Sequence, residues 1–180
     1  MDQLRPNETI ETQRLVLRRP RPEDAALIFE RYHQDAEASR YLRWRPASVI
    51  DQTIAFLQRC QAGWESGETF PLVITLKGDN GPIGMIELRP RGHSVEIAYV
   101  LARAYWNRGY VTEAVCTVVD WVLSQPGAYR VWAVCDVKNA ASARVLEKAG
   151  FQREGILRRW SIHPNVSSEP RDCFCYAIIK

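Results

Sequence analysis

The sequence predicts one α/β domain over residues 1–180, with a mixed, mostly antiparallel sheet of seven strands and helices on both faces. Three observations lead to this fold class. The length suits a single domain, and 46% hydrophobic residues suffice for a packed core. Residues 69–101 contain three strand-like runs in succession, which favours antiparallel neighbours. Residues 94–159 then alternate strand and helix, which requires a parallel crossover within the sheet.

The first third of the chain predicts one strand and two helices. Residues 12–18 alternate leucine with polar residues, as a half-buried strand does. Proline and two acidic residues open a helix over residues 22–33. Ser48 has the position of an N-cap for a second helix, with an acid three residues later. Gly63 and Gly67 mark the end of that helix.

The middle of the chain predicts a three-stranded meander over residues 69–76, 83–88 and 94–101. Asn80 and Gly81 lie between the first two runs, and both residue types tolerate a positive φ. We therefore expect an Asn-Gly hairpin turn at this point.

The second half predicts two capped helices. One runs from Tyr110 to Ser124 and ends before a Pro-Gly pair. The other is capped by Asn139, continues to Lys148 and is terminated by Gly150. The remaining strands are expected over residues 130–135, 151–159 and 173–179.

Charge and composition narrow the function classes. A net charge of +3, with no stripe of aromatic and basic residues, argues against a nucleic-acid binder. No apolar run reaches about 18 residues, and the polar start has no signal-peptide core, so we expect a cytoplasmic protein without a membrane span. Five cysteines fit buried free thiols. The three histidines are scattered, so we expect no metal site.

The most informative segment is residues 106–114, which follows the strand at 94–101 and opens the helix that begins at Tyr110. A tight turn at a helix start collects unpaired backbone N–H groups at the positive end of the helix dipole. Such a turn is a suitable site for a pyrophosphate.

Four segments, in order and at matching spacing, resemble the GNAT superfamily of N-acetyltransferases over essentially the whole chain. The resemblance is nearer to the Rim-type ribosomal-protein alanine N-acetyltransferases. The segments are Thr12–Arg18 with Glu23–Ala25, Gly84–Leu88, Glu96–Leu101 with Tyr105–Ala114, and Asn139–Phe151.

The resemblance implies that acetyl-coenzyme A (acetyl-CoA) lies where the fourth and fifth strands separate. Backbone groups of Tyr99, Val100 and Leu101 would pair with the pantetheine arm. The pyrophosphate would be held by the amides of Asn107, Arg108, Gly109, Tyr110, Val111 and Thr112, with charge added by Arg108. Asn139 would bind the pantetheine from the other edge, although a plain N-cap also explains this residue.

Two side chains are candidates for the chemistry. Glu96, on the strand that leads to the acetyl site, is the preferred base or water relay, with Glu87 on the neighbouring strand as its rival. Glu96 is otherwise a solvated or paired sheet residue. Ser142 would donate a hydrogen bond to the leaving thiolate, and its alternative role is to bond the helix terminus. His163 is a less favoured base.

The sequence departs from the wider superfamily at two positions. Leu146 stands where many relatives have a tyrosine that acts as general acid, and Val111 stands where glycine or alanine is usual. These departures leave open a non-catalytic module that binds coenzyme A.

The acceptor is a primary amine in the leading interpretation, most readily a protein N-terminal α-amine. An α-amine costs about 1 kcal/mol to deprotonate at pH 7, whereas a lysine costs about 4.6 kcal/mol. A small-molecule amine is the alternative within the same class. Trp44, Trp64 and Trp160 are the candidates for acceptor binding. The resemblance also implies a homodimer, which no residue pattern decides.

Overall fold

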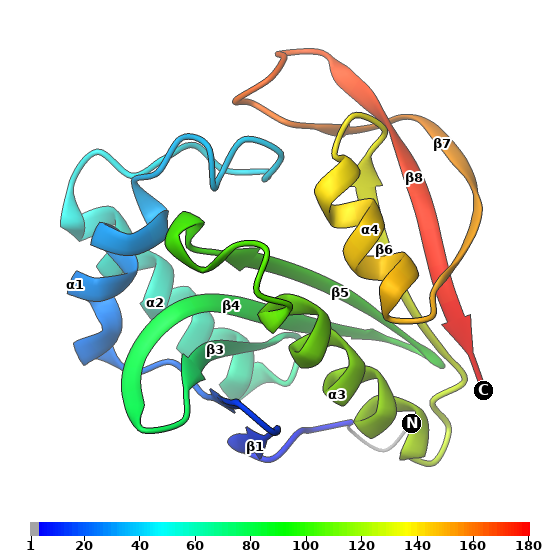
Figure 1. The fold of residues 1–180 in the computed structure, drawn as a ribbon, viewed down its shortest axis with the longest axis horizontal. Helices are drawn as coiled ribbons and strands as arrows, with labels where there is room; N and C mark the ends of the chain where they lie inside the picture. The colour runs from blue at the N-terminus through cyan, green and yellow to red at the C-terminus, as the bar shows by residue number, and fades with distance from the viewer. Residues whose placement is uncertain (1–3) are drawn as a thin grey trace.

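The structure is a computed structural model that describes residues 4–180. It contains one eight-stranded sheet in the order β1-β2-β3-β4-β5-β6-β8-β7 (Figure 1). Every neighbouring pair is antiparallel except β5 and β6, which are parallel. The predicted α/β class with a mixed, mostly antiparallel sheet is therefore confirmed.

The strands are β1 (Thr9–Glu11), β2 (Leu15–Arg18), β3 (Phe70–Leu76), β4 (Asp79–Arg91), β5 (Ser94–Leu101), β6 (Arg130–Asp136), β7 (Gln152–Ile162) and β8 (Pro170–Ile179). The count of seven strands was one too low. The additional strand is β1, which pairs with β2 so that Thr9 lies opposite Arg18. Three residues are too few to show an alternating pattern in the sequence.

The helical segments are η1 (Pro22–Asp24), α1 (Ala25–Ile28), η2 (Phe29–His33), α2 (Ile50–Ser66), η3 (Arg103–Tyr105), α3 (Tyr110–Ser124) and α4 (Ala140–Lys148). In Figure 1, α3 and α4 lie on one side of the sheet, and α1 and α2 lie on the other. Two groups of buried side chains match this arrangement. The larger contains the buried residues of α3, Leu146 of α4 and Trp64 of α2, and the smaller contains the buried residues of α1 with Leu57 and Cys60 of α2.

The turn between β3 and β4 differs from the predicted one. Leu76 pairs with Asp79, so the two turn residues are Lys77 and Gly78 rather than Asn80 and Gly81. Gly78 has a φ of 83° and supplies the positive φ that a tight hairpin needs. The Asn-Gly pair lies within β4, where the Asp79 carboxylate accepts the N–H of Gly81.

The start of α2 also differs. Its N-cap is Val49 in an extended conformation, and no side chain caps it. Ser48 is not the cap, because the first helical hydrogen bond runs from the Gln52 N–H to the Val49 carbonyl, at 3.2 Å. The helix passes through Gly63 and ends at Gly67, which adopts the left-handed conformation common at helix C-termini.

The feature that positions the site is the separation of β5 from β6. These strands pair only over Ser94–Glu96 and Arg130–Trp132. Beyond Glu96, β5 continues to pair with β4, whereas its other edge has no strand partner among residues 4–180. Backbone N–H and C=O groups on that edge are therefore available to bond a ligand.

Residues 4–180 contain neither a helix suited to span a membrane nor a side-chain cluster suited to bind a metal ion. Across residues 4–180, no helix combines the length and the apolar character that crossing a bilayer requires. In the same residues, histidine, cysteine, aspartate and glutamate side chains form no cluster of three or more suited to a metal ion.

Candidate active site

A cavity of about 350 Å³ opens where β5 and β6 separate. Its walls come from residues 97–100 of β5, residues 133–135 of β6 and the first turn of α4. The opposite side is closed by aromatic residues from the segment that joins η2 to α2 and by charged side chains of β4 and β5. The cavity thus lies in the gap between β5 and β6, with α4 on one side and α2 and the segment before it on the other.

The turn between β5 and α3 presents backbone donors at the start of the helix. Gly109 is the N-cap in the left-handed conformation, with a φ of 76°, and no side chain caps the helix. The first helical hydrogen bond runs from the Glu113 N–H to the Gly109 carbonyl, at 3.0 Å. The N–H groups of Tyr110, Val111 and Thr112 are therefore left for a ligand, and an anion suits them.

Val111 and Arg108 flank the exposed donors of this turn. Val111 is buried in the main core, so its side chain lies away from the exposed donors. The larger side chain at this position thus leaves the face of the turn open. Arg108 is exposed, and its guanidinium lies 5.9 Å from the centre of the Tyr105 ring.

The start of α4 brings Asn139 and Ser142 to the cavity. The Asn139 side-chain oxygen accepts the Ser142 N–H at 3.2 Å, which confirms the predicted N-cap. Within residues 4–180 the Asn139 amide NH₂ has no hydrogen-bond partner, so it is free to bond a ligand in the cavity. The cap and ligand roles are compatible at this residue.

Ser142 has a partner that sequence reasoning missed. Its hydroxyl lies 2.8 Å from the Tyr99 hydroxyl, and either group can donate. Burial raises the pKa of Tyr99, so this phenol stays protonated at neutral pH. The sequence predicted a role in the site only for the backbone of Tyr99, not for its side chain. The alternation of β5, which turns Tyr99 away from Glu96 and toward α4, was the signal for its side chain.

The charged side of the cavity contains Glu87 and Glu96, both paired with arginine. Arg89 contacts Glu87 at 2.7 Å and Glu96 at 3.4 Å, and Arg43 lies 3.8 Å from Glu96. Glu96 is therefore a paired sheet residue that also faces the cavity. The structure thus shows the paired sheet residue, and the role of Glu96 as base or water relay stays a prediction.

His163 is also brought to the cavity and is 5% exposed. Its Nε2 lies 3.9 Å from an Asp136 oxygen and 3.6 Å from the Cys173 sulfur, and its buried Nδ1 has no partner in residues 4–180. Burial lowers the pKa of His163, and the nearby Asp136 carboxylate offsets only part of this effect. The ring is therefore neutral at pH 7.

Of the three predicted acceptor tryptophans, the structure places only Trp44 at the cavity, edge-on to the His33 ring. Trp64 is wrong as an acceptor residue, because it is 0% exposed and its indole N–H donates to the Pro71 carbonyl at 2.8 Å. Trp160 lies within β7, not in a loop, and is 47% exposed outside the cavity.

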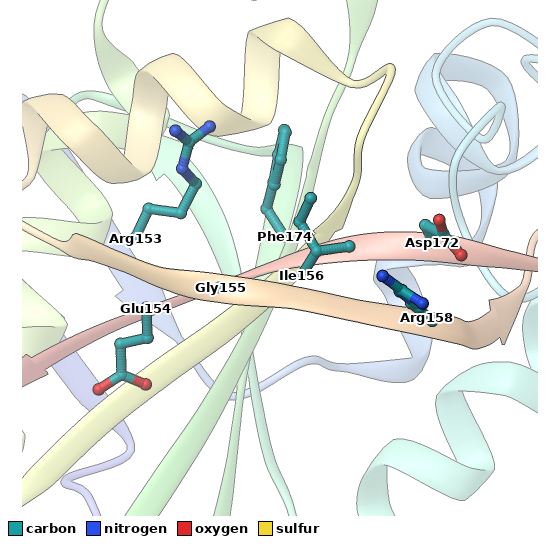
Figure 2. A pocket seen from close by; sticks show the side chains of 7 residues that line it. All are labelled: Arg153, Glu154, Gly155, Ile156, Arg158, Asp172 and Phe174. Atoms are coloured by element: carbon teal, nitrogen blue, oxygen red, sulfur yellow. The ribbon is translucent and has the colours of Figure 1, made fainter.

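A second pocket lies on β7 and β8 and contains none of the predicted site residues. Figure 2 shows Arg153, Ile156 and Phe174 on one side of the β7–β8 hairpin and Glu154 on the other. Glu154 is paired with Arg130, and the Arg153 guanidinium stacks on Phe174. The charges of Glu154 and Arg153 are thus used within the fold.

Comparison with known proteins agrees with this geometry. Residues 14–152 match the model of the acetyltransferase (GNAT) domain. The chain belongs to the GNAT acetyltransferase family.

Relatives of this GNAT domain extend over nearly the whole chain. It is 32% identical to the uncharacterized N-acetyltransferase YoaA of Bacillus subtilis, over 95% of this chain and 96% of that protein. Two solved structures share the fold. Mycobacterium smegmatis RimJ, solved with a coenzyme A disulfide, has a TM-score of 0.84 and 22% identity and covers 97% of this chain and 88% of its own. The microcin C7 self-immunity acetyltransferase MccE, solved with acetyl-CoA and AMP, has a TM-score of 0.85 and 20% identity over 100% of both chains.

The residues of this GNAT domain fit acetyl-CoA, the acetyl donor of the family. Uncapped amides at the start of α3 suit its pyrophosphate, and the unpaired edge of β5 suits the amides of its pantetheine arm. The free Asn139 NH₂ lies on the opposite wall of the same gap. Together these groups provide donors and acceptors suited to the pyrophosphate and the pantetheine arm.

Proposed function

We propose that this GNAT domain acetylates protein N-terminal α-amines, as ribosomal-protein acetyltransferases do. The observation that carries the proposal is the single cavity that joins the β5–β6 gap to Trp44 and to the two arginine-paired carboxylates. Deprotonating an α-amine at pH 7 costs about 1 kcal/mol, whereas deprotonating a lysine costs about 4.6 kcal/mol, so one carboxylate acting through water suffices for an α-amine.

The proposed reaction is direct attack of the neutral amine on the thioester carbonyl. A new N–C bond forms as the C–S bond breaks, and the amine proton passes to Glu96 through water. A backbone N–H at Val100 or Leu101 stabilises the oxyanion. Ser142 donates to the departing thiolate, and Tyr99 orients the Ser142 hydroxyl. Leucine at position 146 has no proton to donate, and Leu146 is fully buried in the core. The Ser142–Tyr99 pair therefore takes the place of the tyrosine that acts as general acid in many relatives.

The experiment that tests this function is a thiol-release assay with acetyl-CoA and two acceptor panels. One panel contains peptides that begin with Ala, Ser or Met and continue with acidic or basic residues. The other contains aminoglycosides and polyamines. We expect turnover on peptides only, and its loss when the α-amine is blocked. Turnover confined to the small amines would refute the N-terminal substrate, and silence on both with coenzyme A bound would favour a non-catalytic binding module.

Removing the Ser142 hydroxyl tests the leaving-group role. A hydrogen bond to a charged group is worth about 1.5–3 kcal/mol, so we expect Ser142→Ala to lower kcat by roughly 10- to 100-fold. Tyr99→Phe removes only the orienting partner and should lower kcat by about 3- to 10-fold. Both effects are read from steady-state kinetics at saturating acetyl-CoA. A change in the acetyl-CoA KM with kcat intact would instead assign Ser142 to binding.

A further inference from the structure

The segment between β1 and β2 reaches across to the turn that precedes α3. The Arg14 Nε lies 2.6 Å from Glu113 Oε2, and the Arg14 backbone N–H donates to Glu113 Oε1 at 2.8 Å. The Thr12 hydroxyl donates to the same oxygen at 2.5 Å. Glu113 is in the first turn of α3. Two residues from the start of the chain thus hold a carboxylate next to the uncapped amides.

Arg14 also contacts the turn on both sides of Gly109. Its Nη1 donates to the Arg108 carbonyl at 3.0 Å, and its guanidinium stacks over the Tyr110 ring at 4.7 Å from the ring centre. Within residues 4–180 its Nη2 has no hydrogen-bond acceptor. That nitrogen lies 3.5 Å from the point that a Cβ on Gly109 would occupy. The guanidinium therefore lies directly against the face of the turn.

The turn needs support from outside itself. Asn107 has a φ of 60° and Gly109 a φ of 76°; glycine adopts this conformation freely, and asparagine adopts it at a modest cost that contacts from other segments can offset. Burial raises the pKa of Glu113, but hydrogen bonds from Thr12 and Arg14 outweigh burial and hold this pKa below its usual value. The carboxylate is therefore ionised and fixed at neutral pH.

We propose that Thr12 and Arg14 form a clamp on residues 107–113 that keeps this turn in the conformation that binds the cofactor pyrophosphate. Arg14 is a positioning residue. It holds the Arg108 carbonyl, whose negative end would repel a phosphate, and its charge offsets Glu113 beside the anion. The inference rests on the proposed use of acetyl-CoA, and it assigns a function to the Thr-x-Arg segment at the start of the sheet.

The test compares two acetyl donors, one of which lacks the pyrophosphate that the clamped turn would bind. Acetyl-pantetheine has the thioester and the pantetheine arm but no pyrophosphate. We expect Arg14→Gln to raise the coenzyme A Kd in calorimetry about 10-fold and to lower kcat/KM for acetyl-CoA equally, with kcat/KM for acetyl-pantetheine unchanged. Equal losses with both donors would show a merely structural role, and an unchanged Kd would overturn the proposal.

A double-mutant cycle tests whether Arg14 acts through Glu113. Glu113→Gln alone should also raise the coenzyme A Kd about 10-fold, and the double variant should raise it little further, well short of about 100-fold. Independent effects that multiply would refute a single Arg14–Glu113 unit. Arg14→Lys keeps the charge but loses the fork of donors, so we expect an intermediate Kd.

Controls separate the clamp from global stability and from the proposed function. Lys77→Gln removes an ion pair with Glu11 near the same edge of the sheet and should leave the coenzyme A Kd unchanged. Thr12→Val, which removes one hydrogen bond to Glu113, replaces Arg14→Gln if that variant fails to fold, and is expected to raise the Kd about 3-fold. Wild-type protein that binds no coenzyme A would refute the proposed function itself, a result distinct from failure of the clamp.

Discussion

Glu96→Gln is expected to lower kcat/KM for the acceptor by about 100-fold or more, within the range that general base catalysis contributes. Glutamine keeps the size and the hydrogen-bonding oxygen of Glu96, but it cannot accept the proton that the substrate amine must lose. The deficit should shrink above about pH 8, where the α-amine is already neutral. The measurement is the pH profile of kcat/KM for a peptide acceptor.

Glu87→Gln is the matched control for this variant, because Glu87 shares the contact with Arg89 and lines the same cavity. We expect less than about 10-fold loss with Glu87→Gln. An equal loss in both variants would assign the effect to the arginine pairing and not to proton transfer. A Glu96→Gln deficit that is constant across pH would likewise contradict the role of a base.

Trp64→Ala is expected to destabilise the domain by about 3–5 kcal/mol, the usual cost of truncating a buried tryptophan. Trp64 is fully buried, packs edge-on against Phe70 with ring centres 5.0 Å apart, and bonds the Pro71 carbonyl. Truncation leaves a cavity and an unpaired carbonyl. The measurement is the free energy of unfolding from urea titration.

Trp160→Ala is the control for the loss of a tryptophan from the surface. Because Trp160 is 47% exposed, we expect its replacement to change the free energy of unfolding by no more than about 0.5 kcal/mol. Trp64→Phe, the milder core variant, should leave the acceptor KM unchanged. A raised acceptor KM in Trp64→Phe without lost stability would return Trp64 to the acceptor site.

Local signals predicted the parts of the fold that local chemistry decides. β5 and α3 have the predicted bounds, and Asn139 caps α4, because strand alternation and helix termini depend on neighbours a few residues away. The β3–β4 turn was misplaced because a hairpin turn depends on the register of both strands. Gly78 and Gly81 both suit a turn, and the sheet selects between them.

The sequence by itself determined the succession along the chain of seven of the eight strands, the tight turn that opens α3 and the candidate chemistry of Glu96 and Ser142. Only the tertiary structure decided which side chains meet. It buried Trp64, joined Tyr99 to Ser142 across 43 positions, and joined Arg14 to Glu113 across 99 positions. Contacts at such separations depend on the order of strands in the sheet and the face that each helix covers, and no periodicity along the chain encodes these.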